Sequence, residues 1–526
     1  MRKITIISII FIAIVLITMI SCNQNDLIAP EIEPSSTPSI STPPVFSKTI
    51  TAFIAKKDDN KFLDYDLVWS IYDDKLILSL SYLFDLSNLE KCTATIYFSD
   101  GTIEKKEMNF TVDTQHFLVI DNNGVEKEYE IITKLITFNL PVFYIEIEND
   151  AEVINREKYL NATIKIDNSG CKYASFKNLK ETPIQIRGRG HYSWTHPKKP
   201  YKIRFEEKTS VLGMKASKNW VLLANYVDRS LIQNYVAMEM GKVMEHIPYH
   251  TNQYPVDVFV NGTYRGVYTF GEQIEAKIER LNLEQGSTNK DTDYLIELGG
   301  ADNGDVLGKD YFNSVLLRDL KIKHPNKTDI TSQQKSFILS YLSKADTAVK
   351  TLSDYENYID IDSLIDWVIL HELTYNLDCC FKRSCFIIKE KGGKLKMGPI
   401  WDFDLAFGSF YRYKKDQWAS VGTEGGYVPI TWMNYLINDE AFMTKFTTRW
   451  NEKKDELLNT AFACIDLMAP LVLPSAEYNF FVWDLLGKDM TSQPVSHKKY
   501  DTYEKMTGRL RSFIHVRYKW IDDQLN

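Results

Sequence analysis

The stretch Gly398-Pro399-Ile400-Trp401-Asp402-Phe403-Asp404 decides the fold of the longer part of this 526-residue chain. It follows a strand that the turn Gly392-Gly393 joins to an apolar strand at Phe386-Ile387-Ile388. A hairpin that delivers carboxylates suits Mg²⁺, a hard cation that commonly takes only one or two protein carboxylates beside substrate phosphates. We therefore predict that Asp402 is a metal ligand, and Asp404 lies two residues further along the same segment.

A second acidic residue lies upstream of this hairpin. Asp378 ends a helical pattern that begins near Ile361, and Ser384 opens the strand that follows. Protein kinases place a catalytic Asp and then, after a hairpin, a magnesium-binding Asp in this order. The pattern thus assigns Asp378 to acid–base work. The competing interpretation of any buried Asp is a helix cap or a salt-bridged carboxylate.

Three other enzyme classes lose support from the sequence. The pair His371-Glu372 has no second histidine four residues after His371, so a zinc-protease motif fails. The chain contains no Gly-x-Ser-x-Gly sequence, which weakens a lipase or esterase interpretation. Asp402 and Asp404 are also too close along one strand to flank a scissile glycosidic bond.

A basic, glycine-containing loop joins two predicted strands around residue 190. Glycines let a backbone approach an anion closely, and their amides can cradle phosphate. A lysine on a strand that faces a glycine loop is how protein kinases hold ATP phosphates. The alternative is a solvated edge strand. The predicted nucleotide contacts in this region are Arg187, Gly188, Arg189, Gly190, Ser193 and Lys202.

The next segment predicts a helix, a hairpin and a linker. Asp228 is placed to cap a helix that runs through Met244, and Asn261-Gly262 forms a hairpin turn. The expected linker is residues 270–274, which include Glu272 and whose backbone would meet adenine, and a charged helix should follow. This is the element order of a kinase small lobe, although a generic α+β core remains open.

The region from residue 140 to 526 is therefore predicted to have an α+β fold with two lobes. Strand patterns dominate to about residue 298, and helical patterns dominate from about residue 330 to the end. The last helix has one apolar face with a period near 3.6, made by Leu510, Phe513, Ile514, Arg517, Ile521 and Leu525.

A small all-β domain is predicted at residues 48–137. Its strand patterns alternate in polarity, and Asp100-Gly101 and Asn123-Gly124 are hairpin signals. Short strands with regular turns favour an immunoglobulin-like sandwich. This region contains no catalytic constellation, so we expect a spacer or a recognition module.

The N-terminus predicts export and a lipid anchor. Residues 1–22 combine a basic start, an apolar run and Ser21-Cys22, which looks like a bacterial lipoprotein signal peptide with Cys22 as the lipidated residue. The alternative is an uncleaved membrane anchor. Residues 23–47 form a Pro/Ser/Thr-rich tether. Both alternatives place the body outside the cytoplasm, on a membrane at the cell surface or in the periplasm.

Composition limits the partners. The formal net charge of −8 gives no support for a nucleic-acid partner. The cysteine spacing shows no small disulfide scaffold, and we expect Cys379, Cys380 and Cys385 to be buried thiols or to form one local disulfide.

Taken together, these segments resemble the CotH (spore-coat protein H) kinase family over about residues 140–526. The resemblance is carried by Ile186–Gly190, Ser193-Trp194, Pro197–Lys202, Trp220–Asn225, Asn261–Tyr268 and Gly398–Asp404, in this order. It implies an atypical protein-kinase-like fold, ATP with Mg²⁺ (or Mn²⁺), and phosphorylation of Ser or Thr in a protein acceptor that the sequence does not identify. It also implies that Asp378 is the acid–base residue, that Asp402 binds magnesium and that Lys202 contacts phosphate. By the same resemblance, Asp404 and Ser384 would be neighbours in the metal site, and Arg187 and Arg189 would act with the glycine loop to neutralise phosphate.

A second functional class, a binding protein without catalytic activity, fits the same residues. A binding protein would keep the kinase-like scaffold for surface adhesion or glycan contact. The joint presence of Lys202, Asp378 and Asp402 favours the enzyme.

Overall fold

The computed structural model describes residues 46–63, 66–72, 74–81, 86–136, 138–301, 305–410, 412–490 and 497–526. By its internal contacts the chain divides into Met1–Phe46 and Ser47–Asn526, and the second unit is the one described below. The predicted signal peptide, with Cys22, and nearly all of the predicted tether lie outside the described residues.

The first part of the second unit is built from two four-stranded sheets. Their orders are β2-β1-β5-β6 and β3-β4-β8-β7, and β4 and β8 pair in parallel. The predicted turns at Asp100-Gly101 and Asn123-Gly124 join β5 to β6 and β7 to β8. Phe53 and Trp69 pack in the core, with ring centroids 5.0 Å apart. The strands are β1 (Ile50–Ala55), β2 (Leu67–Val68), β3 (Ser70–Tyr72), β4 (Lys75–Ser81), β5 (Cys92–Phe98), β6 (Ile103–Met108), β7 (Thr114–Ile120) and β8 (Glu126–Ile136), with a 3-10 turn at Leu86–Leu89.

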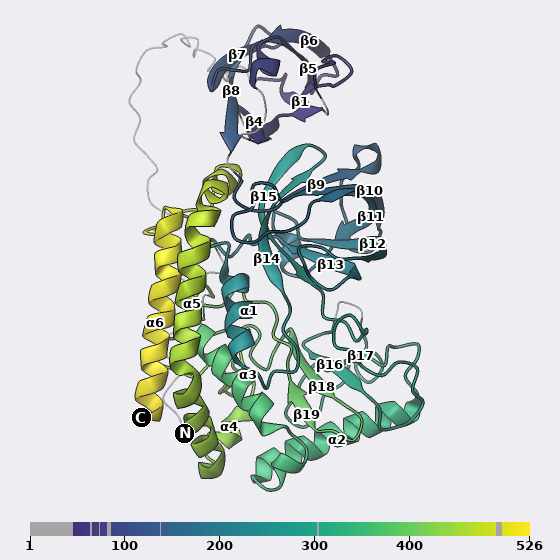
Figure 1. Ribbon diagram of the computed structural model, residues 1–526, viewed down its shortest axis with the longest axis vertical. Coiled ribbons are helices and arrows are strands. Elements are labelled where there is room, and N and C mark those ends of the chain that lie inside the picture. The colour runs from purple at the N-terminus through teal and green to yellow at the C-terminus, as the bar shows by residue number, and fades with distance from the viewer. Residues whose placement is uncertain are drawn as a thin grey trace, which may run out of the picture. The chain divides into compact units, whose positions relative to one another are not determined.

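Seven strands then close into a barrel in the order β10-β11-β12-β13-β15-β14-β9 (Figure 1). Every pair is antiparallel except β14 and β9, whose parallel pairing completes the closure. Alternate residues such as Ile203 and Phe205 point into an apolar core that also contains Trp220 and Phe270. The strands are β9 (Val142–Ile147), β10 (Leu160–Asp167), β11 (Leu179–Gly188), β12 (Tyr201–Thr209), β13 (Ser217–Leu223), β14 (Gln253–Val260) and β15 (Thr263–Glu272), with 3-10 turns at Glu148–Asp150 and Ser193–Thr195.

The remaining elements are a small sheet and six helices. The sheet order is β17-β16-β18-β19, and the hairpin that the sequence predicts before Trp401 is β18–β19. The strands are β16 (Tyr294–Leu298), β17 (Lys321–His324), β18 (Cys385–Lys389) and β19 (Leu395–Met397). The helices are α1 (Gln233–Val243), α2 (Ser332–Thr351), α3 (Ile361–Thr374), α4 (Met433–Leu436), α5 (Glu440–Val482) and α6 (Tyr503–Leu525), with a 3-10 turn at Tyr355–Asn357.

Side-chain caps fix where the long helices begin. Thr331 and Gln334 form a reciprocal capping box at α2. Asp360, Asp439 and Thr502 each accept a hydrogen bond from a backbone amide in the first turn of α3, α5 and α6. These local signals explain why the helices start there.

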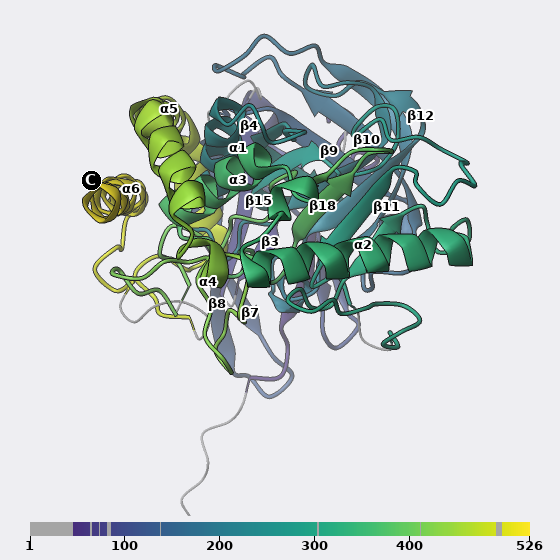
Figure 2. The same ribbon diagram turned by 90° about the horizontal axis from the view of Figure 1, so that it is seen from below.

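The helices share one hydrophobic core. Helices α5 and α6 lie side by side (Figure 1 and Figure 2), and the predicted apolar face of α6 is confirmed because Leu510, Ile514 and Ile521 are buried there. By length and composition alone α5 is the one helix of the described residues that could cross a membrane. Its buried side chains, among them Phe446 and Trp450, belong to this core.

One predicted element is wrong. The charged helix expected after Gln273 is absent, and residues 274–283 form turns instead. Arg280 explains the difference, because its side chain is buried, lies 4.8 Å from the Trp220 ring and forms an ion pair with Glu272 at 3.3 Å. Tertiary contacts of this one residue override the helical preference of the segment.

Candidate active site

Asp378 lies in the turn that follows α3. Tyr375 ends the helix in the left-handed conformation, with φ at 45°, and Asn376 donates its backbone N–H to the His371 carbonyl. The chain then runs through Asp378 to β18. The carboxylate of Asp378 is half-buried, and its Oδ1 accepts a hydrogen bond from the hydroxyl of Tyr427. The predicted acid–base residue therefore lies just beyond the C-terminus of a buried helix.

Asp402 follows the β18–β19 hairpin and is fixed through its backbone. Its φ of 68° is in the left-handed region, which Asp visits more readily than most residues. Its carbonyl accepts hydrogen bonds from Asn376 Nδ2 at 3.0 Å and Cys379 Sγ at 3.2 Å. Its Oδ2 accepts a hydrogen bond from Ser384 Oγ at 3.2 Å. The two predicted metal-site residues Asp402 and Ser384 are thus in direct contact.

Left-handed residues other than glycine gather around these carboxylates. They are Tyr375, Phe381, Ser384, Asp402 and Phe407. Such conformations cost free energy and persist where the surrounding structure imposes them, and they cluster at functional sites. Five such residues fall between residues 375 and 407, the part of the chain that also carries the predicted site carboxylates.

The carboxylates of Asp402 and Asp404 are held in an environment that disfavours their charge. Burial raises the pKa of Asp402, and repulsion by Asp378 raises it further, while Arg189 and the Ser384 hydroxyl lower it. Burial raises the pKa of Asp404 well above its usual range, and repulsion by Asp402 and Asp378 adds to that effect. A cation bound among these three side chains would relieve this repulsion.

Arg189 connects the barrel with this acidic group. It follows β11, and its guanidinium carbon lies 5.8 Å from the centroid of the Trp401 ring. Burial lowers the pKa of Arg189, and the charges of Asp402 and Asp404 oppose that shift. Residues that are more than 200 positions apart in the chain therefore share one electrostatic environment.

Lys202 lies one strand away from Arg189. It pairs with Arg187 across β11 and β12, and Tyr201 and Ile203 on either side of it point into the barrel. Burial lowers the pKa of Lys202 to about 8, and the charge of Glu275 opposes that shift while Arg187 and Arg189 reinforce it. No hydrogen bond or ion pair of its ammonium group occurs among the described residues, so this cation remains available for a ligand.

Two backbone amides of the glycine loop are used within the protein. Gly188 N–H donates to the Asn155 carbonyl at 3.0 Å, and Arg189 N–H donates to the Pro200 carbonyl at 3.2 Å. Both amides are therefore occupied by the protein itself. The glycines instead allow close packing, because a Cβ at Gly188 would meet the Trp194 ring and a Cβ at Gly190 would meet the hydroxyl of Ser193.

Arg187 and Glu272 have structural partners. The guanidinium of Arg187 donates to the carbonyls of Arg156 and Gly188. Glu272, at the end of β15, is 1% exposed, and it accepts hydrogen bonds from Asn252 N at 2.9 Å and Tyr249 Oη at 3.1 Å. The side chain of Glu272 is thus held within the protein, and the adenine contact predicted for its segment is a backbone contact that stays a prediction.

The donor set fits a magnesium ion only together with a substrate. Among the described residues, no group of three or more His, Cys, Asp or Glu side chains lies close enough to hold a metal. Asp402 with Ser384, and Asp404 beside them, supply hard oxygen ligands of the kind that Mg²⁺ uses alongside phosphate oxygens and water. These residues therefore suit a metal that arrives with a nucleotide.

Three residues of this region had no role in the sequence analysis. Tyr427 contacts the Asp378 carboxylate, Lys382 lies on the Tyr427 ring, and Asn234 accepts a hydrogen bond from Phe403 N at 2.9 Å. Tyr427 is 49 positions after Asp378, in a loop without a recognisable motif. Only the tertiary structure brings it to the site.

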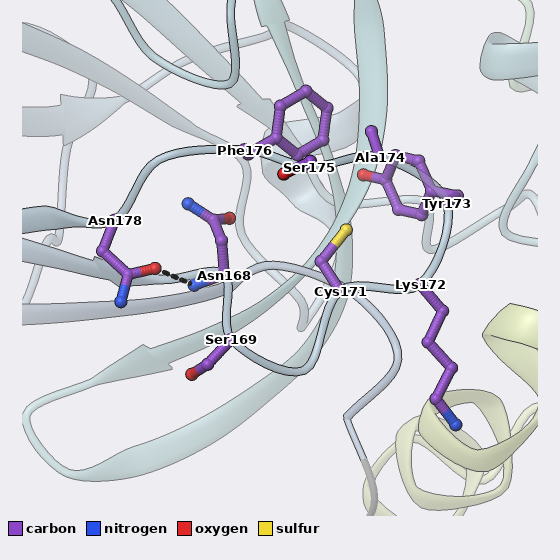
Figure 3. Close-up of a pocket in the computed structure, with 9 residues that line it drawn as sticks. All are labelled: Asn168, Ser169, Cys171, Lys172, Tyr173, Ala174, Ser175, Phe176 and Asn178. Carbon is purple, nitrogen blue, oxygen red and sulfur yellow. Dashed lines mark hydrogen bonds between the residues drawn. The ribbon is translucent and has the colours of Figure 1, made fainter.

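A separate hollow of about 560 Å³ lies in the loop between β10 and β11 (Figure 3). It is lined by Asn168, Ser169, Cys171, Lys172, Tyr173, Ala174, Ser175, Phe176 and Asn178. All of its lining residues come from this one loop, and none of them is a predicted site residue. We therefore place the candidate active site at the carboxylates and not at this hollow.

The three cysteines near Asp378 are free, buried thiols. Burial raises the pKa of Cys379 and Cys380 well above the usual range of a thiol. The alternative of a local disulfide is thereby excluded in this structure, and a hydrogen bond from Cys379 to the Asp402 carbonyl gives one of these thiols a structural role.

The sequence of this chain matches a known protein family. The family described as CotH kinase protein matches residues 184–521, which is most of the chain. The chain belongs to the CotH kinase family. No curated protein matches the chain.

Proposed function

We propose that this protein transfers the γ-phosphoryl group of ATP to a Ser or Thr hydroxyl of a protein acceptor, with Mg²⁺ or Mn²⁺ as the divalent ion. Membership of the CotH kinase family supports a kinase-like function. The structural observation that carries the proposal is the position of Arg189 beside the segment after the β18–β19 hairpin: its guanidinium carbon lies 5.8 Å from the Trp401 ring centroid, and it interacts electrostatically with Asp402 and Asp404. This is the arrangement of charges that a metal-bound triphosphate requires.

Each predicted residue then has a chemical role. Lys202 and Arg189 supply cations for the phosphate oxygens, and Arg187 lies beside Lys202 across the strand pair. Asp402, with Ser384 and Asp404, would hold the divalent ion, which supplies charge neutralisation between phosphate oxygens when it is bound. Because phosphoryl transfer needs little covalent chemistry from the protein, positioning and electrostatics provide most of the rate.

Asp378 would accept the proton of the acceptor hydroxyl. Its carboxylate is half-buried and interacts electrostatically with both Asp402 and Asp404. A base next to the metal site can take the proton as the hydroxyl oxygen attacks phosphorus and ADP leaves. The geometry supports this role, because Asp378 is placed by the end of a buried helix.

The direct test is incubation of the protein with ATP labelled at the γ-phosphate, in the presence of Mg²⁺ or Mn²⁺ and candidate acceptors. We expect transfer by the wild type and a loss of at least about a hundredfold in Asp378→Asn, in the range that general acid–base catalysis contributes. Asp416→Asn is the matched control, because Asp416 is an exposed Asp in a nearby loop. Equal transfer by wild type and Asp378→Asn would refute the role of Asp378.

A thermal-shift measurement separates the enzyme from an adhesion protein on the same scaffold. Binding of ATP and the divalent ion should raise the unfolding temperature of the wild type, because a ligand that binds only the folded state stabilises it. Asp402→Ala should lose most of that shift. No shift in the wild type would favour the non-catalytic surface-binding role. Among the described residues, no contact supports that role independently.

We further propose that the protein is anchored outside the cytoplasm through lipid on Cys22, at the cell surface or in the periplasm. The support is the sequence of residues 1–22. Cys22→Ala should move the protein from the membrane fraction to the soluble fraction, whereas Cys92→Ala, a change at a buried cysteine of the all-β region, should not. Retention of Cys22→Ala on the membrane would indicate an uncleaved apolar anchor.

A further inference from the structure

The hydroxyl of Tyr427 makes the one hydrogen bond found for the Asp378 side chain among the described residues. It donates to Oδ1, and no hydrogen bond or ion pair to Oδ2 occurs in the same part of the chain. A carboxylate has two oxygens that can accept hydrogens independently. One oxygen of Asp378 is therefore tied to Tyr427, and the other is left for a ligand.

The Tyr427 side chain is itself firmly placed. Lys382 Nζ lies 3.0 Å from the centroid of its ring and donates a hydrogen bond to its carbonyl at 2.6 Å. The guanidinium carbon of Arg412 lies 5.0 Å from the ring centroid, and the Phe410 ring packs on Tyr427 with centroids 4.9 Å apart. Two cations and an aromatic ring thus restrict how the phenol can turn.

The loop that carries Tyr427 is anchored at its base. Glu372 of α3 accepts hydrogen bonds from Ala419 N and Ser420 N, both at 2.7 Å. Closer to Tyr427, the Thr423 N–H donates to the Val428 carbonyl at 3.1 Å. Helix α3 therefore fixes both the turn of Asp378 and the loop of Tyr427, so their relative position is set by the same element.

We propose that Tyr427 is a positioning residue for Asp378, which holds the carboxylate so that Oδ2 receives the acceptor hydroxyl. This inference rests on the proposed function. A free Asp side chain samples several rotamers, and only some of them aim an oxygen at the attacking hydroxyl. Tyr427 selects one orientation before the acceptor arrives, and this is pre-organisation of the kind that lowers a barrier.

The competing role for Tyr427 is a plug that occupies the base until the acceptor displaces it. The free Oδ2 argues against a plug, because a blocked base would have both of its oxygens covered. The two roles predict opposite effects when the hydroxyl is removed. Loss of a positioning contact slows transfer, whereas loss of a plug accelerates it.

The test compares Tyr427→Phe with the wild type in labelled-ATP transfer, with kcat and the KM values for ATP and acceptor measured separately. We expect kcat to fall about tenfold, as for loss of one hydrogen bond to a charged group, with both KM values unchanged. Tyr413→Phe is the matched control, because Tyr413 is in the same loop and its hydroxyl has no hydrogen bond among the described residues. That variant should keep the wild-type kcat.

Two further variants keep the inference open to refutation if Tyr427→Phe folds poorly. Lys382→Met leaves the Tyr427 hydroxyl but removes the ammonium that holds its ring, and we expect a smaller fall in kcat. In an Asp378→Asn background, Tyr427→Phe should cause no further loss, because the two residues act as one unit.

The outcomes distinguish this inference from the function on which it rests. Transfer by the wild type with an unchanged kcat in folded Tyr427→Phe, or a raised kcat, would overturn the positioning role and leave the kinase intact. A full additional loss from Tyr427→Phe in the Asp378→Asn background would overturn it as well. Absence of transfer by the wild type would overturn both proposals.

Discussion

Arg517 of α6 and Glu372 of α3 form a buried ion pair, with Nη2 and Oε2 2.8 Å apart and side-chain exposures of 0% and 1%. Arg517 Nε also donates to the Glu372 carbonyl at 2.8 Å. Glu372 also accepts hydrogen bonds from the two backbone amides at the base of the Tyr427 loop. This ion pair therefore links the last helix of the chain both to α3, which precedes Asp378, and to the loop that carries Tyr427.

Removal of one partner of that ion pair should strongly lower the stability of the folded protein. Glu372→Gln keeps the shape of the side chain but leaves the Arg517 charge buried and unpaired, so we expect a loss of about 3–5 kcal/mol in the free energy of unfolding. Denaturant unfolding checks this value. Arg511→Met, a change on the same helix as Arg517, breaks an exposed ion pair with Asp466 of α5 and should change stability by less than about 1 kcal/mol. Equal effects of the two changes would contradict the structural role of Glu372.

Arg189→Met should make the protein depend on divalent cations. Without the guanidinium, Asp402 and Asp404 lose a nearby positive charge that opposes their mutual repulsion. The unfolding temperature of the variant should fall in the absence of metal and should rise with added Mg²⁺ by more than that of the wild type. Arg204→Met is the control, because Arg204 is exposed on β12. An identical Mg²⁺ response in all three proteins would show that Arg189 does not share the metal site.

Lys202 predicts a pH dependence of nucleotide binding. Burial lowers its pKa to about 8, so the ammonium is positive below that pH and becomes neutral as the pH rises through it. Loss of one charge-assisted contact to phosphate should weaken ATP binding by about tenfold between pH 7 and pH 9. Titration calorimetry at the two pH values measures this change. Lys202→Arg should remain charged and show a flat profile, and a wild-type profile equally flat would exclude Lys202 from phosphate contact.

Gly188→Ala tests the packing of the glycine loop. The added Cβ would meet the Trp194 ring and would lie 2.7 Å from the Asn155 carbonyl, so we expect a loss of about 1–3 kcal/mol in the free energy of unfolding. Gly508→Ala is the opposite case, since a Cβ there meets nothing within 4 Å and the residue lies inside α6. That change should stabilise the protein by up to about 1 kcal/mol. Thermal unfolding of both variants settles the comparison.

The features that local sequence determines were predictable. The hairpin at Asn261-Gly262 is present, with φ values of 49° and 70° at its two turn residues, because few other residue pairs adopt that turn easily. The hairpin before Trp401 and the apolar face of α6 also follow from short-range patterns. The order of Asp378 and Asp402 along the chain predicts both acids in one site, and in the structure their carboxylates are close enough to repel each other.

What could not be predicted depends on contacts between distant residues. Closure of the barrel requires β9 to pair in parallel with β14, which lies more than 100 positions later in the chain. No local sequence pattern predicts that pairing. The expected helix after Gln273 is lost because Arg280 is buried against Trp220. The use of the Gly188 and Arg189 amides by the carbonyls of Asn155 and Pro200 likewise appears only in three dimensions.

Closure of the barrel also restricts how another polypeptide can dock on it. A sheet with a free edge can recruit an extended peptide as an additional strand, but a barrel in which β9 and β14 are paired has no such edge. The barrel must therefore recognise a docking polypeptide through its side chains and connecting loops. For an enzyme that modifies single hydroxyls, recognition of this kind would follow the residues beside the modified one and not the extended backbone of the partner.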